Sequence, residues 1–417
     1  MSTFRGIIEE LPGISVDRFE EANRSSSTVF FLSHFHCDHR VGLDQSFFQQ
    51  LTEKNQYLYC SPLTKNFIVT KWNLGSMPDR IREITACNPI VVSYRDPNVG
   101  DSDGNCDLVV TVTAVPAGHC PGSIMLLFEA NRDNKYVTVL CTGDFRIHPE
   151  DFAKLKPLHV KVNGKLVPKA LDNIYLDTTF YDERLEHLPS RQEALGHIVP
   201  VVQDWLRQSD KNFIVIETSA DYGSEDLFSK LSAAVKQRIH VRNWVQESYR
   251  YIPESSVYST ENTHDTRVHA CMMKQQARFR TNNSNPLICR SEVKAENILT
   301  IVPSVLRWIG KDLSKGVTEW EDRRFYVCYS CHASYSELRE FIDYFKPRKI
   351  HPCVVPGVKD AWCPESQEKF REFQAKINYA HLRAPEGRAK SLDCDFMEYK
   401  SFKRLRPKTD KSSDDDF

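Results

Sequence analysis

The chain has 417 residues, of which 41% are hydrophobic and 27% are charged. This balance supports a sizeable folded core and excludes a globally disordered chain. The 55 Lys and Arg residues against 56 Asp and Glu residues give a net charge of -1, which neither supports nor excludes nucleic-acid binding. At about 150 residues per domain, the length predicts two or three domains, or one large domain with an insertion.

The sequence carries no signal for a membrane or the secretory route. It has no apolar run long enough for a transmembrane helix, and its start, MSTFRGIIEELPGISVDRF, places acidic residues and a proline where a signal peptide needs an apolar core. The 13 Cys residues are odd in number and lack framework spacing. We therefore expect reduced thiols inside a cell and no membrane partner.

Short apolar runs alternate with turn signals over residues 1–180, which is typical of a β-rich layered domain. Helices are predicted after Pro62 and around residues 191–207, where Ser190 and Glu193 form a capping-box pattern. The strands predicted in this part are residues 29–32, 58–60, 108–115, 123–128, 136–141 and 173–176.

The second half is less regular. A buried strand is predicted at 213–217, a turn at 221–224 with a helix after it, a strand at 325–329 and a helix at 335–344. Residues 240–320 are mixed and include an Asn-rich break at 281–286. Beyond residue 385 the chain is charged and unpatterned, which predicts a solvated, disordered tail that is also compatible with a basic import or DNA-contacting patch.

The strongest signal is SHFHCDH at residues 33–39, directly after a predicted strand. Residues i and i+2 of an extended segment point the same way, so His34 and His36 can face one ion, and after a turn Asp38 and His39 can face a second. Imidazole and carboxylate suit Zn²⁺, with Mn²⁺ or another divalent ion as alternatives.

Two later motifs can complete this site. His119 lies in AGHCPG and Asp144 lies in TGDF, each after a predicted strand. Asp144 can bridge two ions because a carboxylate has two oxygens. A lone His is usually structural, but chance is a poor explanation for HxHxDH followed by these two motifs.

These motifs and their flanks resemble the metallo-β-lactamase superfamily and, within it, the DNA-repair branch of the β-CASP nucleases. The flanks are SVDRF, FFLSHFHCDHRVGL, YCSPLT, VPAGHCPGSIMLLF, VLCTGDFR, YLDTTF, PSRQEA and YSCHASYSELREF. The resemblance implies an α/β fold, a metallo-β-lactamase αβ/βα sandwich with an inserted β-CASP α/β domain. The implied division is 1–180 for the first part of the sandwich, 181–321 for the insertion, 322–384 for the returning part and 385–417 for the tail.

The resemblance also implies roles for individual residues. One metal would be held by His34, His36, His119 and Asp144, and a second by Asp38, His39, Asp144 and His332. Asp17 would orient a ligand histidine. The implied catalytic residues are Asp38, Asp177 and His332.

The residue at the last motif separates the branches of this family. DNA-directed members usually carry Val there and RNA-processing members His; here HPCVVP places Val354 at that position, with His351 nearby. DNA is therefore favoured, and an RNA-directed nuclease stays a less favoured alternative. Cys37, where relatives carry Lys or Ser, is expected to be an ordinary loop residue rather than an additional ligand or oxidation target.

A second metal site is implied in the inserted segment. Spacing alone favours unrelated Cys and His residues here. The resemblance, however, implies a structural zinc held by His240, His269, Cys271 and Cys289, with no open position. Near His332, the hydroxyls of Ser330, Ser334 and Ser336 are candidates for binding a substrate phosphate, with turn and helix-cap roles as the equal alternative.

No separate nucleophile is apparent, so we expect metal hydroxide to attack a phosphodiester. The resemblance implies a DNA 5′-exonuclease and structure-specific endonuclease acting on hairpins, overhangs and single/double-strand junctions. It would work in the nucleus in double-strand-break repair by non-homologous end joining, with a DNA-dependent protein kinase and end-joining factors as partners. Zn²⁺ would be the cofactor, with Mg²⁺ or Mn²⁺ supporting activity.

The main alternative is a 5′-exonuclease of interstrand-crosslink repair or telomere-end processing. A small-molecule hydrolase is disfavoured by the large insertion, and a non-catalytic scaffold by the intact ligand set.

Overall fold

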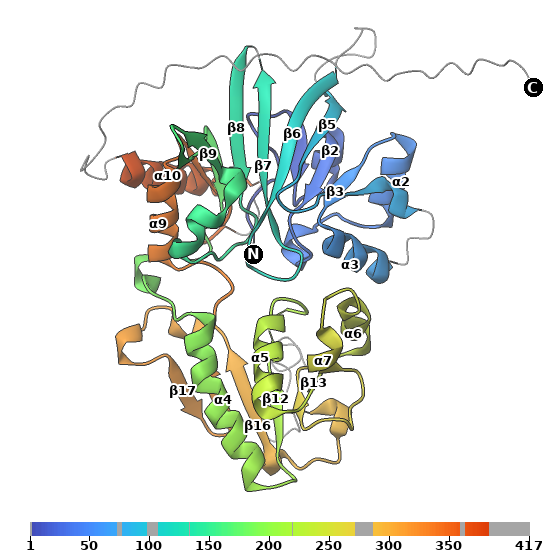
Figure 1. Ribbon diagram of the computed structural model, residues 1–417, viewed down its shortest axis with the longest axis vertical. Coiled ribbons are helices and arrows are strands. Elements are labelled where there is room, and N and C mark those ends of the chain that lie inside the picture. The colour runs from blue at the N-terminus through green and yellow to red at the C-terminus, as the bar shows by residue number, and fades with distance from the viewer. Residues whose placement is uncertain are drawn as a thin grey trace, which may run out of the picture.

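The computed structural model describes residues 2–72, 77–97, 107–132, 134–218, 220–271, 287–358 and 363–382. Figure 1 shows two lobes stacked along the long axis, one carrying β2, β3 and β5–β8 and the other carrying β12, β13, β16 and β17. The expected tail at 385–417 and the expected break at 281–286 lie outside the described residues.

The first sheet of the upper lobe has four parallel strands in the order β1 (Gly13–Val16), β2 (Ser27–Leu32), β3 (Leu58–Cys60) and β4 (Ile81–Glu83). A continuous apolar run such as that of β2 is typical of a strand buried on both faces. Its accompanying helices are α1 (Glu21–Ser26), α2 (Gln45–Glu53) and α3 (Pro62–Trp72). Asp44 caps α2 by accepting a hydrogen bond from the Phe47 N–H.

The second sheet has six strands, in the order β19 (Ile350–Pro352), β11 (Asn173–Leu176), β8 (Lys135–Cys141), β7 (Ile124–Arg132), β6 (Asp107–Pro116) and β5 (Pro89–Arg95). Strands β5 to β8 are antiparallel, whereas β8, β11 and β19 are parallel. A separate hairpin joins β9 (His159–Val162) to β10 (Lys165–Pro168).

The two sheets face each other across one apolar core. Phe31 of β2 meets Phe128 of β7 edge to face, with ring centroids 5.1 Å apart. The other face of the six-stranded sheet is covered by α9 (Tyr335–Phe345) and α10 (Pro364–Leu382), through residues such as Phe341 and Ile377. The upper lobe is therefore the predicted αβ/βα sandwich.

The lower lobe is built on a seven-stranded sheet. Its strands, in order, are β14 (Ser259–Thr260), β13 (Ile239–His240), β15 (Val268–His269), β12 (Phe213–Ile216), β16 (Ile298–Pro303), β18 (Arg324–Val327) and β17 (Thr318–Glu321). Its helices are α4 (Arg191–Gln208), α5 (Glu225–Val235), α6 (Asn243–Tyr249) and α7 (Ser255–Tyr258). The capping box of Ser190 and Glu193 opens α4 as predicted.

The predicted division of the chain at residues 180 and 322 stays a prediction. Strand β18 still pairs with β16 of the lower sheet, so the chain crosses back to the upper lobe after Val327. Val327 lies beyond the expected boundary at residue 322, because the strand predicted at 325–329 is part of the lower sheet.

One continuous apolar core joins the lobes, because residues of both contribute to it. Phe67 of α3 stacks on Tyr222 of the lower lobe, with ring centroids 4.5 Å apart and 13° between the planes. The turn that carries Tyr222 is thereby held against the upper lobe. None of the described helices has the length and apolar character needed to cross a membrane.

Candidate metal centres

Seven predicted site residues lie in loops that follow strands, and most of these strands belong to the two sheets of the upper lobe. His34 and His36 follow β2, and His39 ends the short 3₁₀ turn Cys37–His39. The others follow β6, β8, β11 and β18 and are, respectively, His119, Asp144, Asp177 and His332. Loops on a rigid sheet edge are where reactive groups usually lie.

The first cluster consists of His34, His36, His119 and Asp144, whose ligand atoms all lie within 4.8 Å of one another. His36 Nδ1 lies 3.1 Å from His34 Nε2 and 3.0 Å from His119 Nε2. Asp144 Oδ2 lies 3.6 Å from His34 Nε2 and 3.5 Å from His119 Nε2. A tetrahedral ion with bonds of about 2.0–2.1 Å separates its ligands by roughly 3.3–3.4 Å, so the spacing suits Zn²⁺.

In two of these histidines, the ring nitrogen that points away from the cluster fixes the tautomer and so decides whether the other nitrogen carries a lone pair or a proton. His36 Nε2–H donates to the Tyr222 carbonyl at 3.0 Å, and His119 Nδ1–H donates to the Cys331 carbonyl at 3.0 Å. A carbonyl can only accept, so the inward nitrogens of both neutral rings carry lone pairs. Two lone pairs 3.0 Å apart repel each other unless a cation lies between them. The donor set therefore fits a divalent metal.

The second predicted set is only partly assembled. His39 Nε2 lies 3.1 Å from Asp144 Oδ1, and His332 Nε2 lies 3.9 Å from Asp144 Oδ2. His39 Nε2 is buried, and in the described structure its partner is Asp144 Oδ1, as an ion pair rather than a hydrogen bond of good geometry. Asp38 belongs to none of the clusters found among the described residues, and its Oδ2 accepts a hydrogen bond from the Ser2 N–H at 3.0 Å.

Electrostatics keep the first cluster in its ligating form. Burial, and then the neighbouring His39, hold the pKa of His34 well below its usual value. Burial and His332 do the same to the pKa of His119. Although burial opposes ionisation, His39 and His332 hold the pKa of Asp144 well below its usual range. Neutral imidazoles around an ionised carboxylate are the form that binds metal.

Two buried carboxylates orient His39 and His332, the two histidines of the second predicted set. Asp17 Oδ2 lies 2.9 Å from His39 Nδ1, and its two oxygens also accept from the backbone N–H and the hydroxyl of Ser33. Asp177 Oδ2 lies 2.8 Å from His332 Nδ1. Each carboxylate takes the Nδ1–H and leaves Nε2 facing Asp144. Asp17 thus lies where the sequence predicts, and Asp177 contacts a histidine of the predicted ligand set.

The three serines near His332 are engaged locally. Ser330 Oγ accepts from the His332 N–H and donates to its carbonyl. Ser334 caps α9 in a capping box with Glu337, and Ser336 Oγ lies 2.9 Å from His187 Nδ1. These contacts match the turn and cap alternative, and phosphate binding by these hydroxyls stays a prediction.

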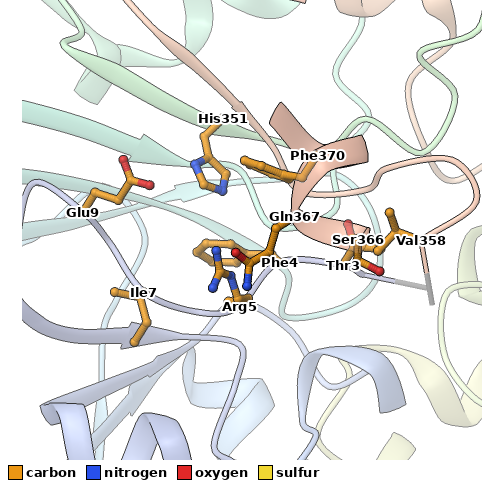
Figure 2. Close-up of a pocket in the computed structure, with 10 residues that line it drawn as sticks. All are labelled: Thr3, Phe4, Arg5, Ile7, Glu9, His351, Val358, Ser366, Gln367 and Phe370. Carbon is orange, nitrogen blue, oxygen red and sulfur yellow. The ribbon is translucent and has the colours of Figure 1, made fainter. Parts of the chain in front are cut away.

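His351 lies away from the metal clusters. Its ring packs against Tyr175 and Phe370, with centroids 4.4 and 4.7 Å away, and lines a cavity of about 270 Å³ with Phe4 and Glu9 (Figure 2). Burial lowers its pKa to about 4. The residues that line this cavity include none of the metal-cluster residues, so His351 faces a separate cavity.

A second complete cluster lies in the lower lobe, where His240, His269, Cys271 and Cys289 come within 4.8 Å of one another. The two His Nδ1 atoms are 3.0 Å apart, the two Sγ atoms 3.4 Å, and Cys289 Sγ is 3.4 Å from His269 Nδ1. The sheet produces this meeting, because His240 and His269 are register partners on β13 and β15. The geometry suits a closed tetrahedral site.

Some contributors to the site were not predicted. The carbonyls of Tyr222 and Cys331 fix the tautomers of two histidines, and Ser33 Oγ lies 3.0 Å from His34 Nδ1. Backbone carbonyls leave no trace in side-chain identity, so no sequence pattern could reveal them. Ser33, which directly precedes the histidine motif, was visible but was not assigned a role.

The class of protein follows from these features: a two-sheet αβ/βα sandwich carries a His/Asp metal centre at its loop edge and an inserted α/β lobe. This is the metallo-β-lactamase fold. The family model described as "DNA repair metallo-beta-lactamase" matches residues 253–358. Among solved structures, the subclass B3 metallo-beta-lactamase BJP-1 of Bradyrhizobium japonicum is 15% identical, covers 36% of this chain and 56% of its own, and has a TM-score of 0.21.

Among curated proteins, the chain is 34% identical to "Protein artemis" of Rattus norvegicus over 361 residues, which are 85% of this chain and 49% of that protein. It is 27% identical to "5' exonuclease Apollo" of Rattus norvegicus, over 86% of this chain and 56% of that protein. The chain is thus Artemis- and Apollo-like, and its residues 253–358 match the DNA-repair metallo-β-lactamase family model. It spans about half the length of these curated relatives.

Proposed function

We propose that this protein is a metal-dependent phosphodiester hydrolase that cleaves DNA. The observation that carries the proposal is the first cluster, in which three imidazoles, two of them of fixed tautomer, converge with one carboxylate. The similarity to Artemis and to the exonuclease Apollo supports DNA as the substrate. Val354 at the last motif, with His351 turned into a separate cavity, favours DNA over RNA.

In this proposal His34, His36, His119 and Asp144 hold one ion, and His39 and His332 hold a second that shares Asp144. When bound, such ions acidify water and neutralise charge on a phosphate. Asp17 keeps His39 oriented, and Asp177 keeps His332 oriented, through the hydrogen bonds described above. Asp38 adds a negative charge beside His39, which favours binding of the second ion. In the structure its carboxylate accepts a hydrogen bond from the Ser2 N–H.

His240, His269, Cys271 and Cys289 hold a structural zinc in the same proposal. All four ligand positions are protein atoms, so no place remains for substrate. The ion would tie β13, β15 and the 3₁₀ turn Ile288–Arg290 together at one edge of the lower sheet.

The finer proposal is an Artemis-type activity: 5′-exonuclease and structure-specific endonuclease at hairpins, overhangs and single/double-strand junctions. Its process would be non-homologous end joining in the nucleus, with a DNA-dependent protein kinase and end-joining factors as partners. The greater similarity to Artemis than to Apollo supports this choice. Zn²⁺ is the proposed cofactor, with Mg²⁺ or Mn²⁺ supporting activity. The proposed division of the chain is at residues 180, 322 and 384, and it assigns to the returning part a strand, β18, that pairs with β16 of the lower sheet.

The test is cleavage of an end-labelled DNA hairpin with a 5′ overhang, beside an RNA hairpin of the same sequence. We expect opening of the DNA hairpin near its tip, at least about 100-fold slower for Asp144→Asn. The rate should be unchanged for Asp182→Asn, a partly exposed carboxylate that pairs with Arg184 outside the described metal clusters. Loss of single nucleotides from the 5′ end alone would instead favour an Apollo-like exonuclease. Cleavage of RNA alone, or equal rates for Asp144→Asn and wild type, would contradict the proposal.

A further inference from the structure

A row of cations and indole rings lies where the two lobes meet, beside the first metal cluster. Its members are Arg40, Lys71, Trp72, Arg242 and Trp244, which we call the cation–indole surface. Arg40 directly follows His39, and Lys71 and Trp72 are the last two residues of α3. Arg242 is the N-cap of α6, and Trp244 is the second residue of that helix. Helices α3 and α6 are in contact, so the row crosses from one lobe to the other.

The side chains of the surface touch one another in sequence. The Arg40 guanidinium lies 5.5 Å from the Trp72 ring centroid, and Lys71 Nζ lies 5.8 Å from the centroids of both Trp72 and Trp244. The Arg242 guanidinium lies 6.0 Å from the Trp244 centroid. Arg40 also lies 4.6 Å from the Phe35 ring centroid, and Arg242 Nε donates to the Cys271 carbonyl at 2.6 Å. Lys71 is held only by the long contacts of about 6 Å, so its ammonium can turn toward a ligand.

Positive charge is in excess on the cation–indole surface. Asp221 Oδ1 lies 3.6 Å from Arg242, and burial raises the pKa of Asp221 although Arg242 and Lys71 oppose the shift. One carboxylate therefore faces three cations. Within the described ranges, Arg40 Nε is also buried without a hydrogen-bond partner. Excess charge with an unmet donor indicates an anionic ligand.

Tyr222, the residue after Asp221, connects the cation–indole surface to the metal cluster. The carbonyl of Tyr222 accepts the hydrogen bond of His36 Nε2–H, and Tyr222 contacts Trp244 edge to face at 6.4 Å. The Trp244 side chain is nevertheless 39% exposed. A strand crossing this surface would thus lie next to the metal cluster, within reach of both exposed indole and cations.

We propose that the cation–indole surface holds the single-stranded arm of the DNA substrate, with phosphates on Lys71 and Arg40 and one unpaired base against Trp244. This inference rests on the proposed function. A positive groove with an aromatic platform is the general means of binding unpaired strands, because every base has a π-face and every nucleotide a phosphate. Bases inside a duplex are already stacked on both faces, so in this proposal Trp244 favours substrates with an unpaired nucleotide beside the scissile bond.

The test is binding of a fluorescent phosphorothioate oligothymidine to the zinc-loaded protein, with one abasic nucleotide moved along the strand. Trp244→Ala should weaken binding about 5- to 100-fold and abolish the penalty of the abasic position that faces the ring. Trp244→Phe should restore most of the affinity, and Trp320→Ala, a 57% exposed indole on β17, should change nothing. Lys71→Ala should lower the slope of log affinity against log salt by about 0.7.

Equal binding by Trp244→Ala and Trp320→Ala, or an abasic penalty that survives Trp244→Ala, would overturn the inference. Cleavage of the hairpin by the same proteins is scored separately. A protein that cleaves DNA but binds strands independently of Trp244 overturns this inference alone. A protein that binds through Trp244 but never cleaves overturns the proposed function alone.

Discussion

At the scale of single residues, the metal centre depends on hydrogen bonds that decide which ring nitrogen keeps its lone pair. His36 presents Nδ1 to the cluster because its Nε2–H donates to the Tyr222 carbonyl, whereas His119 presents Nε2 because its Nδ1–H donates to the Cys331 carbonyl. The histidines and Asp144 were predictable from their motifs. Which nitrogen each would use was not, because the acceptors are backbone atoms contributed by the lower lobe and by the segment leading back from it.

Asp177→Asn tests the orienting role of that carboxylate. The neutral amide oxygen accepts the hydrogen bond from His332 Nδ1–H more weakly than the charged carboxylate does. We therefore expect DNA cleavage to fall about 10- to 100-fold. Cleavage rates and zinc content measured together check this. Asp182→Asn, a surface carboxylate paired with Arg184, is the matched control. Unchanged cleavage by Asp177→Asn would show that His332 needs no carboxylate partner.

Glu225, at the start of α5, gives a prediction about pH. The residue is 6% exposed, and burial raises its pKa from 4.5 to about 7, against opposing hydrogen bonds from the Gly223 N–H and the Tyr249 hydroxyl. Its folded-state pKa is above the unfolded one, so its contribution to stability is fully present below about pH 4.5 and is lost as the pH rises through 7. The loss is about 3 kcal/mol at most.

Glu225→Gln should remove this dependence. Urea unfolding between pH 5 and pH 8 would measure the free energy of unfolding of both proteins. We expect the stability of wild type to fall relative to that of the variant as the pH rises. Parallel curves for the two proteins would mean that the Glu225 carboxyl ionises in the folded protein as easily as in the unfolded chain.

At the scale of elements, the sequence predicted those with a strong local pattern. Apolar runs such as VFFL in β2 and ILTIVP in β16 are both buried strands, but only the first was predicted, because it stands between clear turn signals. Strand β5 was missed because its apolar residues occupy exposed as well as buried positions, so hydrophobicity does not alternate along its sequence. Val91 is exposed and Val92 is buried. The site in the lower lobe could not be derived from spacing, because strand register brings His240 and His269 together and a separate 3₁₀ turn supplies Cys289.

The proposed structural zinc is tested by Cys289→Ala. Removal of one of four ligands should cost the protein one zinc equivalent and lower its melting temperature by at least about 4 °C, because metal binding and folding are coupled here. Zinc analysis and thermal unfolding measure both effects. Cys363→Ala, a cysteine outside every described cluster, should leave both unchanged. An unchanged zinc content in Cys289→Ala would contradict the assignment.

At the scale of the whole molecule, the site exists only because two lobes share one core. His332 lies just beyond the insertion and Tyr222 lies within it, yet both reach the loops of the upper lobe. No local pattern in the sequence encodes this meeting. It was expected only from the resemblance to a family in which the sandwich is interrupted.

Phe67→Ala tests the joining of the lobes. Its ring is fully buried and stacks on Tyr222, so the truncation should lower the free energy of unfolding by about 3–5 kcal/mol. Cleavage should fall as well, because the turn that holds His36 loses its support. Urea unfolding and hairpin cleavage measure the two effects. Phe67→Leu is the control that keeps most of the volume, and a loss below about 1 kcal/mol for Phe67→Ala would contradict the prediction.

The most direct measurement of the central claim is anomalous diffraction at the zinc edge from crystals grown with zinc. The account predicts one peak enclosed by His34, His36, His119 and Asp144, and another enclosed by His240, His269, Cys271 and Cys289. A peak beside His39 and His332 would add the second ion of the proposed pair. Crystals of DNA-cleaving protein with no peak among the three histidines and Asp144 would contradict the claim that this cluster is the metal centre.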